Sequence, residues 1–70
     1  MPDPQDKQTG LRMRQFRRNA GLTQAQLAEK TGIHVNTIAR LERGKHTPSH
    51  PTLRKLAEVL GVTVSDILGY

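Results

Sequence analysis

The sequence predicts a compact all-α fold of five helices, because three kinds of signal agree along its 70 residues. Apolar residues recur at the spacing of a single helix face, and no stretch is read as a strand. Residues that cap helix starts precede these apolar runs, and a glycine follows each of the first four of them. These glycines are Gly21, Gly32, Gly44 and Gly61. A chain this short forms one domain with a simple apolar core.

The first helix is predicted to begin near Gly10 and to end at Gly21. Met13, Phe16 and Ala20 supply its apolar spacing. The segment 1–9 before it is polar and contains two prolines. We therefore expect a disordered N-terminal tail over 1–9 and a folded domain over 10–70.

The second and third helices are predicted on either side of a tight turn at Gly32. Thr23 and Gln26 have the spacing of a capping box, which starts the second helix. A glycine in the turn allows the positive φ that such a corner requires. The third helix spans 34–43, with Ile38 and Leu41 on its inward side.

Two further helices complete the prediction. Ser49 or His50, followed by Pro51, opens the fourth helix, whose inward residues are Leu53, Leu56, Ala57 and Leu60. The fifth helix repeats the capping signal of the second, with Thr63 as cap and Asp66 three residues later.

Positive charge is concentrated in the middle of the chain. The net charge is +5, and in residues 10–45 the basic residues outnumber the acidic ones eight to two. Such a distribution favours a polyanionic partner. The chain has no cysteine, no secretion signal and no apolar run of membrane length. We therefore expect a cytoplasmic protein without disulfides and without a membrane partner.

The pair of helices around Gly32 predicts a helix-turn-helix, in which one helix supports a second that enters the major groove of DNA. If Ile38 and Leu41 are buried, the opposite side of helix 34–43 is exposed, and its polar side chains suit base recognition. Asn36 can pair with adenine and Arg40 with guanine, while Val35 can touch a thymine methyl group. The expected base contacts from the outward residues are Val35, Asn36, Thr37 and Arg40.

Contacts to DNA phosphates are expected from the start of the second helix and from nearby basic residues, because free backbone amides and positive charge meet there. The candidates are Gln24, Arg43, Lys45, His46 and Arg14. A basic residue taken alone is more often part of an ordinary solvated surface, and only the placement of several beside one helix favours phosphate binding.

The chain resembles the Cro and lambda-repressor type of helix-turn-helix family from about Leu11 to Leu68. The resemblance rests on the segments Gly21-Leu22-Thr23-Gln24, Leu27-Ala28-Glu29-Lys30-Thr31-Gly32-Ile33, Ile38-Ala39-Arg40-Leu41-Glu42-Arg43-Gly44-Lys45 and Leu56-Ala57-Glu58-Val59-Leu60-Gly61-Val62. It implies a five-helix fold of the lambda-repressor-like type, a groove-reading third helix and phosphate binding by Gln24.

The resemblance also implies an ion pair between Arg17 of the first helix and Glu42 at the end of the third. The sequence departs from the family pattern at His34, where a serine or threonine cap is common. Histidine is a weaker cap, and we therefore add His34 to the expected base contacts.

The function predicted is a sequence-specific transcriptional regulator of double-stranded DNA, expected to be a repressor. One short helix reads few base pairs, so we expect a homodimer on a palindromic operator, with the fifth helix and Tyr70 as its contact. The alternative is a DNA-binding antitoxin or an adaptor that acts through a protein partner. The basic outward face of helix 34–43 favours DNA, because a protein partner would select an apolar stripe there.

An enzyme is not expected. The sequence has no cysteine nucleophile, no glycine-rich phosphate loop and no carboxylate pair beside a histidine. His46 and His50 have a spacing that suits metal ligands on a helix, but Pro48 and Pro51 prevent that helix. We accordingly expect no metal site and no cofactor.

Overall fold

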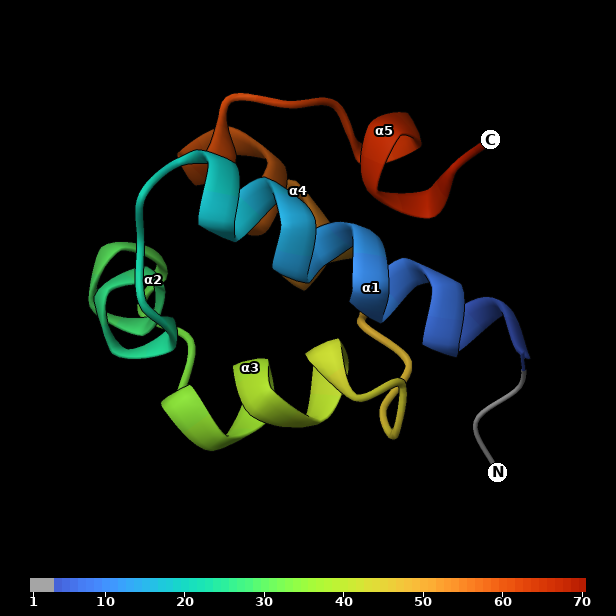
Figure 1. Cartoon of the computed structure of the whole chain (residues 1–70), viewed down its shortest axis with the longest axis horizontal. Coiled ribbons are helices and arrows are strands. Elements are labelled where there is room, and N and C mark those ends of the chain that lie inside the picture. Colours follow the sequence, from blue (N-terminus) through green and yellow to red (C-terminus); the bar gives the residue numbers. More distant parts are fainter. Residues whose placement is uncertain (1–3) are drawn as a thin grey trace.

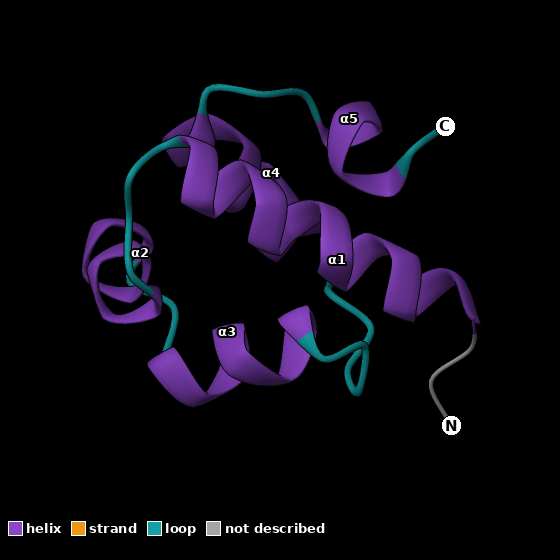
Figure 2. Cartoon of the chain, in the orientation of Figure 1, coloured by secondary structure: helices purple, strands orange, loops and turns teal. Residues whose placement is uncertain are grey.

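The computed structural model of the protein describes residues 4–70 and contains five helices (Figure 1). They are α1 (Pro4–Asn19), α2 (Gln24–Thr31), α3 (Val35–Glu42), α4 (His50–Leu60) and α5 (Val64–Leu68). Helices and connecting loops account for all the described residues (Figure 2), so the all-α fold class is confirmed. None of these helices is both long enough and apolar enough to cross a membrane.

The predicted caps set the helix starts. Thr23 and Gln26 form a reciprocal capping box at α2, and Thr63 and Asp66 form another at α5. At α4 the choice left open by the sequence is settled in favour of Ser49, whose side chain accepts a hydrogen bond from the Thr52 amide. These bonds satisfy backbone amides that the first turn of a helix cannot pair internally.

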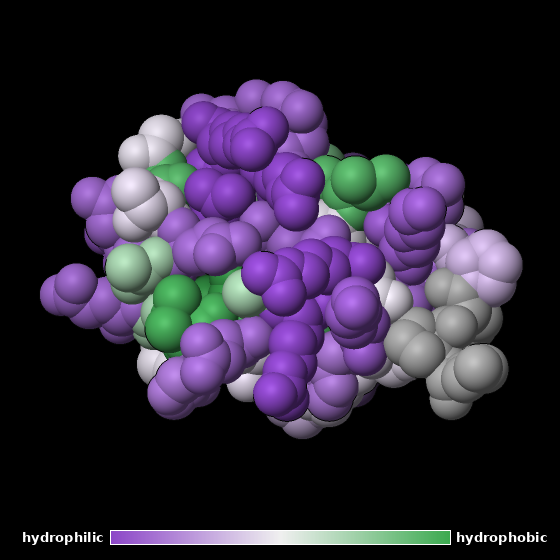
Figure 3. Space-filling model, turned by 60° about the horizontal axis from the view of Figure 1, so that its bottom comes forward, coloured by the Kyte–Doolittle hydropathy of each residue, from purple (hydrophilic) through white to green (hydrophobic). Residues whose placement is uncertain are grey.

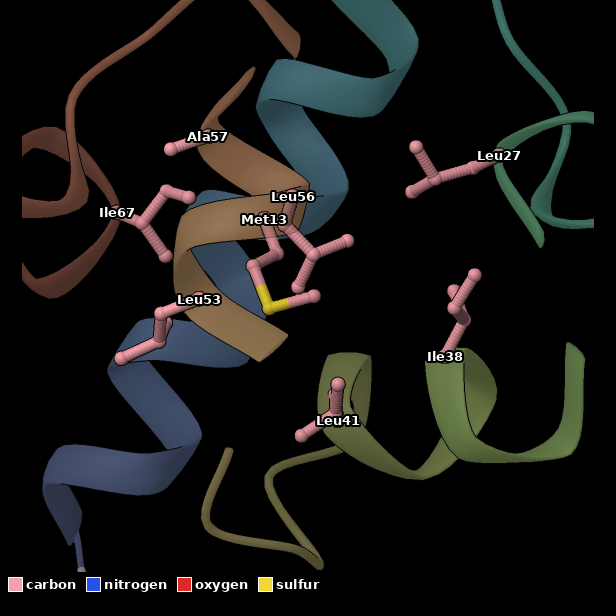
Figure 4. Packing of buried hydrophobic residues seen from close by; sticks show 8 residues of the cluster. All are labelled: Met13, Leu27, Ile38, Leu41, Leu53, Leu56, Ala57 and Ile67. Carbon is pink, nitrogen blue, oxygen red and sulfur yellow. The ribbon is translucent and has the colours of Figure 1, made fainter. Parts of the chain in front are cut away.

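Side chains from all five helices converge on one apolar core (Figure 4). Its buried members are Met13, Leu27, Ile38, Leu41, Leu53, Leu56, Ala57 and Ile67. Burial of each large aliphatic side chain contributes about 1.5–3 kcal/mol relative to exposure. Phe16 and Leu60, expected on inward faces, are half-buried at the edge of this core, and Ala20 is exposed just beyond α1.

The predicted disorder of the first nine residues is wrong for the part that the structure describes. Pro4–Thr9 form the first turns of α1, and Asp6 and Thr9 are only 7% and 2% exposed. A proline in the first turn of a helix costs nothing, because its missing N–H would have no partner there. The polar residues that suggested a tail are partly buried against the rest of the fold. Residues 1–3 lie outside the described residues.

The first turns of α1 pack closely on the end of α3. A Cβ atom at Gly10 would lie 2.7 Å from the carbonyl oxygen of Glu42 and closer still to that of Leu41. A Cβ atom at Gly44, just after α3, would lie 2.9 Å from the backbone nitrogen of Lys7. Two glycines thus allow backbone to meet backbone, which fixes how α3 lies against α1.

Candidate nucleic-acid interface

The turn between α2 and α3 holds the two helices at a fixed angle. Gly32 has φ 75°, which a residue with a Cβ rarely adopts, and its amide donates to the Ala28 carbonyl. The buried hydroxyl of Thr31 donates to the Leu27 carbonyl at 2.8 Å and accepts from the Ile33 amide at 3.2 Å. Thr31 therefore connects the last turn of α2 to the corner, a role that its place in the sequence does not reveal.

The α3 helix has one buried and one exposed face. Ile38 and Leu41 are 0% and 1% exposed, whereas Asn36 and Arg40 are exposed. Val35 is 36% exposed at the start of the helix. The orientation predicted from the periodicity is therefore confirmed. In Figure 3 the side of the molecule that carries α3 is largely hydrophilic, with small hydrophobic areas between the polar side chains.

His34 caps α3 through its ring. The Nδ1 atom accepts a hydrogen bond from the Asn36 amide at 3.1 Å. In the neutral ring this leaves the proton on Nε2, so the outer edge of the exposed imidazole is a hydrogen-bond donor. A histidine in this position can cap the helix and present a donor to a partner at the same time.

The ion pair implied by the family resemblance is present. Arg17 Nε donates to Glu42 Oε2 at 2.7 Å and Arg17 Nη2 donates to Glu42 Oε1 at 3.1 Å. Arg17 Nη1 also donates to the Leu22 carbonyl at 2.8 Å. The pair joins α1 to the end of α3, and the Leu22 bond extends it to the segment leading into α2.

Two further side chains contact the Glu42 carboxylate. Gln24 Nε2 donates to Oε1 at 3.1 Å, and Arg14 Nε lies 3.5 Å from the same oxygen. Burial acts to raise the pKa of Glu42, but the hydrogen bonds from Arg17 and then Gln24, with the nearby positive charge, outweigh it and hold this pKa below its usual range. The bond to Glu42 raises the pKa of Arg17 in spite of partial burial.

This network places two of the predicted phosphate contacts side by side. Gln24, at the start of α2, and Arg14, in α1, are both half-buried and both contact the carboxylate of Glu42. Their spacing in the sequence gives no sign that they meet. The sequence signal for the buried carboxylate is the Arg17–Glu42 pair that the family resemblance implies.

The remaining phosphate candidates follow α3. Arg43, Lys45 and His46 are exposed in the segment that joins α3 to α4. The candidates thus form two groups, one that contacts the carboxylate of Glu42 from α1 and the start of α2, and one that follows α3 in the chain. Over residues 4–70, no three His, Asp or Glu side chains gather where they could hold a metal ion.

A pair of helices braced across a glycine turn, with an exposed polar and basic face on the second, defines a helix-turn-helix DNA-binding domain. Comparison with known proteins agrees with this class. The helix-turn-helix family profile matches residues 13–67. The chain belongs to this family, of the Cro and lambda-repressor type, and is a DNA-binding transcriptional regulator.

Two curated relatives illustrate the similarity. An uncharacterized HTH-type transcriptional regulator of Archaeoglobus fulgidus is 41% identical over 56 residues, which cover 80% of each chain. The immunity repressor protein of Bacillus phage phi105 is 42% identical over 60 residues, covering 86% of this chain. The matched part is 42% of the phage repressor, so the present chain spans less than half of that protein.

Two solved structures share the fold. The clp gene regulator ClgR from Corynebacterium glutamicum superposes with a TM-score of 0.88 at 29% identity, covering 97% of this chain and 72% of that one. The restriction-modification controller protein C.AhdI from Aeromonas hydrophila gives a TM-score of 0.85 at 29% identity, covering 89% of this chain and 94% of that one. The predicted five-helix, lambda-repressor-like fold is confirmed.

Proposed function

We propose that this regulator reads the major groove of an operator with α3 and represses transcription as a homodimer. One observation carries the proposal: the side of α3 opposite Ile38 and Leu41 exposes Asn36 and Arg40. The amide and the guanidinium group are the side chains that pair most selectively with adenine and guanine. Val35, exposed beside them, adds an apolar surface for a thymine methyl group.

Base contacts of this proposal also include Thr37 and His34. Thr37 is half-buried on α3, and its hydroxyl can donate to or accept from a base edge. His34 reaches DNA with the Nε2–H that remains free to donate when Nδ1 caps the helix. All of these residues lie within the first two turns of α3 or just before it, the part of a recognition helix that contacts base edges.

Phosphate contacts from two parts of the chain fix how deeply α3 enters the groove. Gln24 and Arg14 contact the DNA backbone, and both already lie against Glu42 in the free protein. Arg43, Lys45 and His46 contact it from the loop after α3. Contacts of this kind supply most of the affinity and set orientation, whereas base contacts supply selectivity.

Repression and dimerisation rest on relatives and on geometry. A phage immunity repressor is among the relatives. One short helix reads too few base pairs for useful selectivity, and two copies on a palindrome double that number, with half-sites about 34 Å apart. The aromatic ring of Tyr70, 76% exposed beyond α5, is available for the contact between copies. A regulator of this kind has no catalytic role and acts where the cell's DNA is, in the cytoplasm.

Selection of bound sequences from a random duplex library, repeated at two salt concentrations, tests the proposal. A recovered palindrome supports specific reading by a dimer, and recovery of random sequence contradicts it. Sedimentation with and without the recovered duplex measures stoichiometry independently. One protomer per operator at micromolar protein would exclude the homodimer.

Variants then separate the two kinds of contact. Asn36→Ala and Arg40→Ala should relax base preference at individual positions, each costing about 1–3 kcal/mol on the selected operator. Lys45→Ala should instead weaken all duplexes similarly and lower the salt slope by about one. Lys55→Ala, an exposed basic residue on α4, is the matched control for loss of charge. If all the interface variants changed affinity equally on operator and random DNA, α3 would not be the reading helix.

A further inference from the structure

The first turns of α1 pack against the loop that follows α3, a contact that the sequence did not predict (Figure 1). The hydroxyl of Thr47 in this loop donates to Asp6 Oδ2 at 2.7 Å. One turn earlier in the loop, Gly44 lies against the backbone of Lys7. Lys45 and His46 stand between these two points of attachment. The segment with the proposed phosphate contacts is therefore held by α1 at both ends.

The bond between Asp6 and Thr47 contributes a polar contact to this attachment. Asp6 is 7% exposed although it carries a carboxylate, whereas Thr47 is exposed. A hydrogen bond to a carboxylate is stronger than one between neutral groups. Ordering a loop residue otherwise costs about 1–2 kcal/mol of backbone entropy at the moment of binding. A loop that is ordered before DNA arrives avoids this cost.

We infer that Asp6 is a positioning residue for DNA binding: it holds the loop 43–48 through Thr47, so that Lys45 and His46 meet the phosphate backbone in a fixed geometry. This inference rests on the proposed phosphate contacts of that loop. It assigns a role in the DNA interface to the start of α1, a segment that composition alone suggests is a tail. Asp6 acts through Thr47 and does not itself touch DNA.

Charge alone predicts the opposite effect for this residue. DNA repels a carboxylate, so removing an acidic side chain near the interface should strengthen binding by long-range electrostatics. A positioning role predicts that binding weakens in spite of the lost repulsion. The sign of the change therefore distinguishes the two explanations without any assumption about its size.

Asp6→Asn and Thr47→Val test the inference. Asn keeps the size of the side chain and removes its charge, while Val keeps the size of threonine and removes the hydroxyl. Each variant should weaken binding of the selected operator by about three- to tenfold. Glu58→Gln, which neutralises an exposed acidic residue on α4, is the matched control and should leave affinity equal or slightly higher. Unchanged or tighter binding by both Asp6→Asn and Thr47→Val would overturn the inference.

Two further measurements separate positioning from loss of stability. Thr47 is exposed, so Thr47→Val should leave the thermal unfolding midpoint within a few degrees even if Asp6→Asn lowers it. Amide hydrogen exchange should nevertheless become faster in residues 44–48 of both variants while the core amides stay protected. An unchanged loop with normal DNA affinity would contradict the inference.

Combination with Lys45→Ala distinguishes failure of this inference from failure of the proposed function. If Lys45 contacts phosphate and Asp6 positions it, Lys45→Ala should cost less in the Asp6→Asn background than in the original protein. Equal costs in both backgrounds would remove the role of Asp6 and leave the phosphate contact intact. No effect of Lys45→Ala in either background would instead contradict the proposed phosphate contact.

Discussion

Replacement of Glu42 by glutamine should destabilise the fold strongly, although the two side chains have nearly the same shape. The Glu42 side chain is 0% exposed, and it receives two hydrogen bonds from Arg17, at 2.7 and 3.1 Å. Glutamine has no charge and offers one acceptor instead of two. The variant therefore leaves the largely buried guanidinium group of Arg17, with 11% of its side chain exposed, without a counter-ion.

The size of the effect follows from the burial of the pair. Removing one partner of a buried ion pair costs about 3–5 kcal/mol. Arg17 keeps its 2.8 Å bond to the Leu22 carbonyl and some contact with water, so we expect the lower end, about 3 kcal/mol. A chain of this length has a total stability of about 3–10 kcal/mol, so the loss is a large part of it. The thermal midpoint should fall by about 12–24 °C.

Thermal unfolding followed by circular dichroism, at neutral pH and moderate salt, measures this loss directly. Glu58→Gln removes an exposed acidic residue and should change stability by less than about 0.5 kcal/mol. The double variant Arg17→Met/Glu42→Leu replaces the pair by apolar side chains and should recover most of the lost stability. A midpoint for Glu42→Gln within about 3 °C of the original protein would refute this reasoning about the pair.

The double variant also tests whether Glu42 orients the DNA-facing groups. Gln24 donates to Glu42 at 3.1 Å and Arg14 lies 3.5 Å from it, and both lose this partner when the carboxylate is removed. We therefore expect the double variant to fold well and still bind the operator more weakly. Full affinity in a stable double variant would mean that Glu42 serves stability only.

Three further predictions concern stability. The pKa of Glu42 is lower in the folded than in the unfolded chain, so the ionised carboxylate stabilises the fold above its unfolded pKa, and this stabilisation is lost as the pH falls through its folded pKa. The free energy of unfolding measured in urea should therefore decline below about pH 5. The decline should be less steep in Glu42→Gln, which has no carboxylate at this position. Gly10→Ala should lower the thermal midpoint, because the Cβ of alanine would meet the carbonyl oxygens at the end of α3. This loss should exceed the gain of about 1 kcal/mol that alanine gives over glycine within a helix. A higher midpoint would show that α1 can shift away from α3 at this position. Leu56→Ala, at a position that is 0% exposed, should cost about 2–5 kcal/mol in urea unfolding, whereas an exposed site such as Lys55→Ala should cost less than about 0.5 kcal/mol.

Interactions between residues close in the sequence made several elements predictable from the sequence alone. Capping boxes at Thr23 and Thr63 and the glycine turn at Gly32 act over a few residues, so sequence spacing is enough to find them. The faces of α3 followed from Ile38 and Leu41 for the same reason, since helical periodicity fixes which side chains point away from a buried stripe. The Arg17–Glu42 pair was inferred only from resemblance to a family, because nothing local connects residues so far apart in the chain.

The start of α1 shows a feature that interactions between near neighbours do not determine. Polar composition and two prolines predict a tail over residues 1–9, yet Pro4–Thr9 are helical and Asp6 is buried. Their contacts come from residues far along the chain, Thr47 and the end of α3. The gathering of Gln24, Arg14 and Arg17 on one carboxylate has the same origin. The sequence alone determined the number of helices over residues 4–70, the capping boxes at Thr23 and Thr63 and the exposed face of α3, since these depend on near neighbours. Only the tertiary structure decided which polar groups meet across helices, since burial and pairing between distant residues exist only once the chain has folded.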